Sequence, residues 1–227
     1  MGNVYKYKYI IMTPTLTPYN HFPTTIYAID KPEFLDNVRS ISMKYLENIK
    51  KEKKEQDQEQ ALLYPVQTYG FFHEPEMDEF NSFVLGSARA ILMNQGYNMD
   101  DKVPFLQEMW CQEHNRLQGH DEHIHSDGNQ ITGFYFIDAP ESGCKVALHD
   151  PIYTRRQVAL PEKDLDTITE ASKTVLYVPK PGSLYFINSW LPHSVTRNLG
   201  KDPTRMVHFN ISVRAMPPQS TKKAVVL

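Results

Sequence analysis

Residues 123–137 read His-Ile-His-Ser-Asp-Gly-Asn-Gln-Ile-Thr-Gly-Phe-Tyr-Phe-Ile, so a histidine-rich segment leads directly into a β-rich one. β-Branched and aromatic side chains fill residues 131–137, a composition that is typical of a strand. The chain keeps this character from about residue 105, with turns rich in proline and glycine between its short β-rich segments. Further strands are predicted at 174–178, 183–187 and 206–213. Such a succession of short strands favours a sandwich or a jelly roll.

Helices are predicted before this β-rich part. The first begins at about Lys31, where Pro32 fits the first turn, and it repeats apolar residues at steps of three and four. The second follows Asp78 and Glu79, whose negative charges suit the positive end of a helix, and Gly96 can end it. Apolar stripes of this kind normally pack on a core, so we expect both helices to cover a sheet.

The chain has 227 residues, and its 24 Lys and Arg against 27 Asp and Glu give a formal net charge of −3. A domain that binds nucleic acid through its overall charge would be strongly basic, so that class is excluded. The length suits one all-β barrel with an extension. We therefore expect a single domain over 1–227, with N-terminal strands and supporting helices at 1–104, a jelly-roll core at 105–214 and a tail at 215–227.

The sequence predicts neither a membrane protein nor a secreted one. No apolar run approaches the ~18 residues that a membrane span needs. Lysines interrupt the N-terminus before an apolar run develops, so it does not resemble a secretory signal. Cys111 and Cys144 are too few for a disulfide framework and lack metal-ligand spacing, so we interpret both as reduced thiols. The protein is expected to be soluble and cytoplasmic.

Four of the 9 histidines crowd residues 114–125. Because side chains alternate along a strand, His123, His125 and Asp127 would project from one face. Two neighbouring ligands can occupy adjacent positions around a metal, and the third must then come from elsewhere. His193 is the candidate, because it follows a predicted strand that begins at a Pro-Gly turn. Two histidines and one carboxylate on one face of an iron leave its other positions open for substrate and oxygen.

These histidines could instead be ordinary residues held by hydrogen bonds. A second feature favours the metal site. Alternation places Arg205 on the same strand face as Val207, Phe209 and Ile211. A buried guanidinium needs an anion, and a small dicarboxylate suits it because the two groups form parallel hydrogen bonds. An internal salt bridge with an Asp or Glu is the other possibility for this arginine.

The ordered set of His125-Ser126-Asp127, His193 and Arg205 resembles the signature of the iron(II)- and 2-oxoglutarate-dependent oxygenases, which is His-x-Asp, a distant His, then Arg or Lys. The resemblance covers residues 105–214 and is nearest to the uncharacterised oxygenases of tailed bacteriophages. It is carried by Met109-Trp110, His123-Ile124-His125, Gly133-Phe134-Tyr135-Phe136, His149-Asp150-Pro151 and His208-Phe209-Asn210.

The resemblance implies a double-stranded β-helix, which is a jelly-roll barrel, in a mainly β fold with flanking N-terminal helices packed on it. Iron(II) and 2-oxoglutarate are the implied cofactors, and O2 is the co-substrate. His125, Asp127 and His193 would bind the iron, and Arg205 the far carboxylate of 2-oxoglutarate. The implied reaction hydroxylates an unactivated C–H bond and releases succinate and CO2. By analogy the substrate is a small molecule or a peptide, with a prolyl residue as the first choice. A phage-encoded enzyme would act in the host cytoplasm.

Two further residues affect which groups would bind the iron and the 2-oxoglutarate. His123 has the same two-residue spacing from His125 as Asp127, so His123 is the alternative ligand and a three-histidine site stays open. Many prolyl-hydroxylase-like members have a tyrosine that binds 2-oxoglutarate where this chain has Phe136, and Thr132, on the same strand face, is the candidate replacement. The competing hypotheses are a cupin-like metal-binding protein, a metalloenzyme that does not use 2-oxoglutarate, and a non-enzymatic interaction domain, each on the same barrel.

Residues 150–173 lack a firm pattern and are expected to form a long loop of the kind that often acts as a lid. In this loop, Arg155, Arg156 and Lys163 could hold an acidic or peptide substrate, although loop cations are often only solvated. Trp110 and Trp190 could each line the pocket or fill the core.

Overall fold

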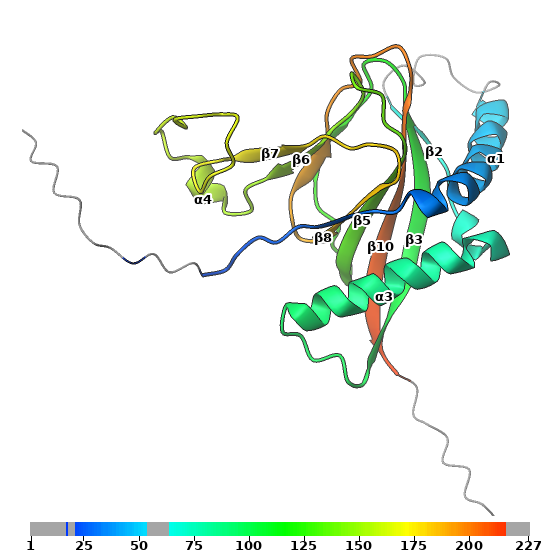
Figure 1. Cartoon of the computed structure of the whole chain (residues 1–227), viewed down its shortest axis with the longest axis horizontal. Helices are drawn as coiled ribbons and strands as arrows, with labels where there is room; N and C mark the ends of the chain where they lie inside the picture. The colour runs from blue at the N-terminus through cyan, green and yellow to red at the C-terminus, as the bar shows by residue number, and fades with distance from the viewer. Residues whose placement is uncertain (1–16, 18–20, 54–63, 217–227) are drawn as a thin grey trace, which may run out of the picture.

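The computed structural model describes residue 17 and residues 21–53 and 64–216, and within them the strands form two antiparallel sheets (Figure 1). The large sheet has the order β1 (Tyr27–Asp30), β8 (Ser183–Asn188), β5 (Asn129–Asp138), β10 (Thr204–Ala215), β3 (Lys102–His114) and β2 (Val66–Gln67). The small sheet has the order β4 (His120–His123), β9 (His193–Val195), β6 (Val146–His149) and β7 (Thr174–Tyr177). The predicted mainly β fold is confirmed. Of the predicted N-terminal strands, residues 1–16 and 18–20 lie outside the described residues, as do residues 217–227 of the tail predicted at 215–227.

The central strand β10 has two different faces. Val207, Phe209 and Ile211 belong to a buried apolar cluster that also contains residues of the helices. Met206 belongs to a second cluster, which contains residues of both sheets and so fills the space between them. Since neighbouring residues of a strand alternate in direction, His208 and Asn210 share the inner face with Met206. The side chains that face the small sheet are therefore polar over part of β10.

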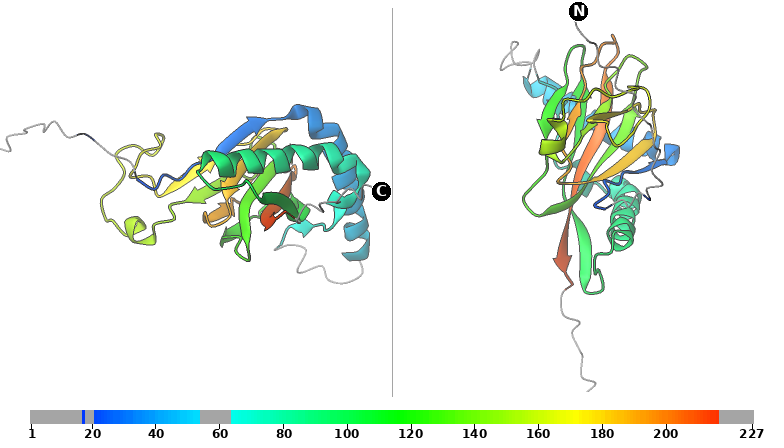
Figure 2. Two further views of the ribbon diagram at one scale, coloured as in Figure 1. Left: turned by 90° about the horizontal axis from the view of Figure 1, so that it is seen from below. Right: turned by 90° about the vertical axis from the view of Figure 1, so that its left-hand side faces the viewer.

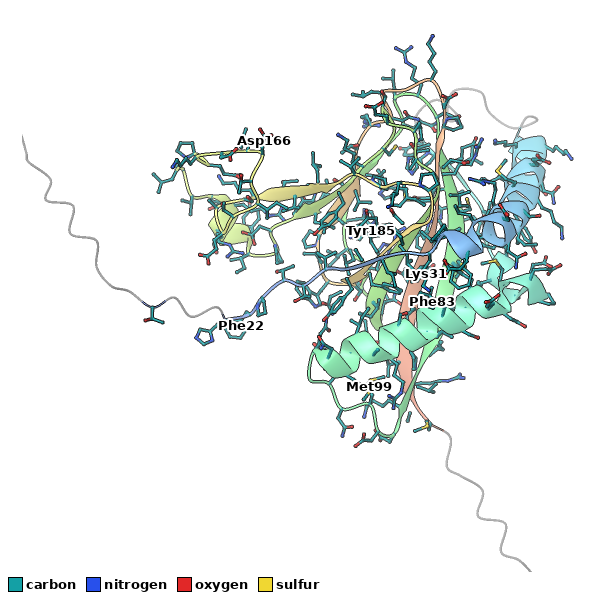
Figure 3. The ribbon with its side chains drawn as sticks, viewed as in Figure 1. Phe22, Lys31, Phe83, Met99, Asp166 and Tyr185 are labelled. Atoms are coloured by element: carbon teal, nitrogen blue, oxygen red, sulfur yellow. The ribbon has the colours of Figure 1, made fainter. Side chains whose placement is uncertain are left out.

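Two helices cover the outer face of the large sheet, as Figure 2 shows. The first is α1 (Leu35–Lys53), which follows the short helix η1 (Pro32–Phe34), and the second is α3 (Asp78–Asn94), which follows η2 (Phe71–His73) and η3 (Pro75–Met77). The ring of Phe80 on α3 lies 6.2 Å from that of Phe209, centroid to centroid. Where the chain enters η1, the ammonium of Lys31 lies 4.6 Å from the ring centroid of Phe83 (Figure 3). Both predicted helices are confirmed.

Residues 150–173 are irregular except for the single turn of α4 (Tyr153–Arg156), and Figure 1 shows them projecting beyond β6 and β7. The predicted loop is thus present. Among the residues that the structure describes, neither long helix has the length and apolar character that crossing a bilayer would require.

Candidate metal centre

Three imidazoles from two distant parts of the chain meet between the sheets. His123 ends β4 and His193 begins β9, and the two residues are direct partners in the pairing of these strands. His125 follows β4, and its backbone N–H donates a hydrogen bond to the carbonyl of Ser189 (2.9 Å), next to the end of β8. One ligand atom from each of the three rings lies within 4.8 Å of the other two. This group has the size and the donor type of a transition-metal site.

Backbone carbonyls orient two of these rings. Nδ1 of His193 lies 2.9 Å from the carbonyl oxygen of Leu191, and Nδ1 of His123 lies 2.7 Å from that of Asp121. A carbonyl can only accept, so each Nδ1 carries the proton and each Nε2 keeps a lone pair. Nε2 of His193 and Nε2 of His125 are buried and have no hydrogen-bond partner in the part of the chain that the structure describes. Orphaned nitrogens of this kind are what a metal ion would satisfy, so iron fits the residues present.

Asn210 orients the third ring. Its Nδ2 lies 3.1 Å from Nδ1 of His125 and 2.6 Å from a carboxylate oxygen of Glu108, while its Oδ1 accepts a hydrogen bond from the Thr132 hydroxyl (2.6 Å). The Glu108 carboxylate can only accept, so the end of the amide that contacts Glu108 and His125 is its nitrogen. Thr132 therefore acts on His125 through Asn210. Sequence reasoning missed Asn210 and Glu108, although a buried asparagine in an apolar strand was a usable signal.

Burial lowers the pKa of each ring. It brings the pKa of His193 to about 3 and that of His125 to about 4, and the neighbouring histidines contribute in the same direction. Burial also lowers the pKa of His123. The imidazoles are therefore neutral at neutral pH, and the neutral ring is the form that binds a metal.

The structure does not bring Asp127 into this group. Strand β4 ends at His123, and Asp127 lies in an exposed turn with a φ of 63°, followed by Gly128 with a φ of 86°. The expectation that His123, His125 and Asp127 share one face assumed a continuous strand, and the turn breaks that alternation. Of the two ligand sets left open by the sequence, the geometry favours the three histidines.

Arg205 also lies apart from the imidazoles. Alternation did place it correctly with Val207 and Phe209, but that face of β10 is turned to the helices. Nε of Arg205 lies 2.7 Å from a carboxylate oxygen of Glu113, and NH1 lies 2.8 Å from one of Asp138. The internal salt bridge considered from the sequence is therefore present, and the expected contact of Arg205 with 2-oxoglutarate stays a prediction that this pairing does not favour.

Two cations of the loop are likewise paired with acids. The guanidinium of Arg155 makes two hydrogen bonds to the Asp150 carboxylate, at 2.6 and 2.9 Å. Arg156 donates to the carbonyl of Asp150 and lies 2.7 Å from Glu122. Neither of these arginines is free to hold an acidic substrate without first giving up a resident partner.

Comparison with known proteins gives a family match for the β-rich part of the chain. Residues 108–210, from β3 to β10, match the model of a family described as "Putative 2OG-Fe(II) oxygenase". This segment belongs to that family. Iron(II) and 2-oxoglutarate, predicted from the sequence, are the cofactors that the family's description names, and the family's enzymes are oxidoreductases. No curated protein matches the chain in sequence.

Several solved structures share the fold of this chain. AviO1 from Streptomyces viridochromogenes has a TM-score of 0.60 at 10% identity, over 86% of this chain and 92% of that one. A prolyl-4-hydroxylase from Pseudomonas putida has a TM-score of 0.52 at 11% identity, over 83% and 92%. The viral collagen prolyl hydroxylase of Paramecium bursaria Chlorella virus-1, solved with 2-oxoglutarate, has a TM-score of 0.51 at 13% identity, over 85% and 96%. The likeness to phage oxygenases stays a prediction.

Proposed function

We propose that this oxygenase hydroxylates a C–H bond of a small molecule or a peptide, with iron(II) held by His123, His125 and His193. The convergence of these three rings carries the proposal, since their ligand atoms lie within 4.8 Å of one another. Three ligands on one side of a metal leave positions for 2-oxoglutarate and O2. The alternative set with Asp127 in place of His123 would require the turn at Asp127 to reorganise.

Iron(II) with 2-oxoglutarate and O2 supplies the oxidation: one oxygen atom enters the substrate as a hydroxyl group, and the other enters succinate as CO2 leaves. The chain's own part is to hold and shield this chemistry. The carbonyls of Asp121 and Leu191 fix two ligand rings in the metal-binding tautomer. Phe134, which is fully buried, lies with its ring 5.3 Å from that of His193 and so excludes water from one side of the metal.

The structure also has an open cavity of about 500 Å³, which none of the three histidines lines. It lies between the end of α3 and the end of β10, and Ser189, whose carbonyl accepts from His125, lines it. The partly exposed rings of Trp190 and Tyr97 also line it and offer flat apolar surfaces to a ring such as that of proline. Trp190 thus lines this cavity and not the three-histidine group, and a prolyl residue is the first substrate to test by analogy with the prolyl hydroxylases that share the fold.

The test loads the protein with iron(II) without oxygen and adds 2-oxoglutarate. We expect a weak visible charge-transfer band, and succinate release once O2 and a prolyl peptide are supplied. His193→Ala should weaken metal binding at least about a hundredfold, because it removes a ligand outright. His149→Gln is the matched control, since the His149 ring contacts Ser194 and Thr174 outside the three-ring group.

Two outcomes would contradict the proposal. Metal binding that survives His193→Ala unchanged would refute the three-histidine centre. Metal binding without the band and without succinate, for every substrate screened, would instead favour the cupin-like alternative.

A further inference from the structure

Two buried ring nitrogens on the inner wall of the barrel have no partner among the described residues. Nε1 of Trp110 on β3 and Nε2 of His208 on β10 are both inaccessible to solvent and form no hydrogen bond. The residues are only 6% and 3% exposed. A buried polar group left unsatisfied costs about 1–3 kcal/mol, so two neighbouring ones call for a ligand that completes them.

These two side chains form one surface. Trp110 and His208 are direct partners in the pairing of β3 with β10, and their ring centroids lie 4.3 Å apart. The same surface adjoins the metal ligands: the ring of His208 lies 4.8 Å from that of His125 and 5.9 Å from that of His193, and Trp110 lies 5.9 Å from His125. A molecule bound to the metal from this side would therefore contact both.

The charge balance of the site favours a ligand with two negative charges. Three neutral imidazoles leave the two positive charges of iron(II) uncompensated, and 2-oxoglutarate carries two negative charges. In the ligand set implied by the family signature, Asp127 would add one negative charge and Arg205 one positive charge. Here Asp127 is in an exposed turn and Arg205 is paired with Glu113 and Asp138, so both charges are absent from the site together. The metal and the co-substrate can then neutralise each other without a buried arginine.

We propose that Trp110 and His208 donate hydrogen bonds to a carboxylate of metal-bound 2-oxoglutarate, in the role that arginine has in the family signature. This inference rests on the proposed function and adds residues that the signature does not contain. Neutral donors suffice because the iron already supplies the positive charge, and hydrogen bonds to a charged acceptor are among the strongest in proteins. The buried indole and imidazole also keep the site free of competing water.

The experiment measures binding of 2-oxoglutarate to the manganese(II)-loaded protein by calorimetry, so no turnover is needed. Trp110→Phe and His208→Phe keep aromatic packing and remove one donor each, and each should weaken 2-oxoglutarate at least about tenfold. Manganese affinity should stay within about threefold of the wild type, and His208→Gln, which keeps a donor, should restore most of the binding. Arg205→Gln is the matched control and should leave 2-oxoglutarate affinity unchanged.

A second readout does not depend on these substitutions. Trp110 and Trp190 are the two tryptophans of the chain, so Trp190→Phe leaves Trp110 as the reporter. Its emission should change saturably as 2-oxoglutarate is added to the manganese-loaded protein. The inference is overturned if wild type binds 2-oxoglutarate while both donor variants bind it equally well, or if Arg205→Gln alone abolishes binding. If the wild type takes up manganese but no 2-oxoglutarate at all, the proposed function falls as well.

Discussion

Arg205 is held by acids on the helix side of the large sheet. The Glu113 side chain is 3% exposed and pairs with both Arg205 (2.7 Å) and Lys50 of α1 (2.6 Å). Asp138 pairs with Arg205 (2.8 Å) and with Arg39 of α1 (3.0 Å). Burial alone would raise the pKa of Glu113, but Lys50 and Arg205 outweigh burial and leave that pKa lowered. Arg205 thus helps to fasten α1 to the sheet.

Replacing Arg205 by Ala should therefore lower stability. Glu113 would keep only Lys50 as its partner, so we expect the free energy of unfolding to fall by about 2 kcal/mol. Urea unfolding of the metal-free protein measures this. Lys102→Ala, which breaks the exposed pair with Asp101, is the control and should change stability by less than about 0.5 kcal/mol. A stable Arg205→Ala protein would contradict the structural role.

The sequence identified the candidate site residues, but it did not show which way each of their side chains points. His125 and His193 were predicted and do converge. Alternation grouped Arg205 with Val207 correctly, yet it could not tell which face of β10 looks into the barrel. Asp127 lies outside the group because a left-handed turn follows His125, and a strand pattern does not reveal where the strand ends. Tertiary packing decides which face of a strand is turned inward and at which residue the strand ends.

Strands β5 and β10 depend on one close contact between them. Gly133 and Phe209 are direct partners, and a Cβ at Gly133 would overlap the ring of Phe209. That ring packs on Phe186 and on Phe80 of α3, so it has little room to move. Only glycine lets the phenylalanine lie across the neighbouring strand.

Gly133→Ala should therefore destabilise the protein by about 1–3 kcal/mol through overpacking. Gly86→Ala is the matched control on α3: its added Cβ meets nothing within 4 Å, and alanine favours a helix, so we expect a gain of about 0.5–1 kcal/mol. Thermal unfolding of both variants gives the comparison. Equal effects of the same sign in the two variants would show that the contact with Phe209 is unimportant.

Both long helices and several strands were predicted, including the four-residue β7, but the 13-residue β3 and the short strands β6 and β9 were not. The apolar repeats of α1 and α3 span several turns, and β5, β8 and β10 are long and rich in β-forming residues. Strands β4, β6 and β9 have only three or four residues, too few to show a period. These short strands make up most of the small sheet, on which His123 and His193 lie, so the metal side of the barrel was the less predictable half.

For the molecule as a whole, the interior of the barrel binds fewer protons than the unfolded chain. His114 is fully buried on β3, and burial, with a smaller contribution from His120, lowers its pKa to about 4 from an ordinary 6.5. His125 and His193 are shifted in the same direction. Below pH 6.5 the unfolded chain binds protons that these folded-state rings do not, so their contribution to the free energy of unfolding decreases as the pH falls, and the share of His114 levels off near pH 4.

His114→Gln isolates the share of one residue in this pH dependence. Each such group contributes up to about 1.4 kcal/mol per pH unit between its two pKa values and nothing above pH 7.5, where both states are neutral. Urea unfolding with a chelator present should show wild type losing more stability than His114→Gln between pH 7.5 and pH 5, by about 2 kcal/mol. The difference between the two proteins at pH 7.5 reports lost packing alone and serves as the internal control. Parallel pH profiles would mean that His114 is protonated in the folded protein, and the barrel would then have to admit water at that position.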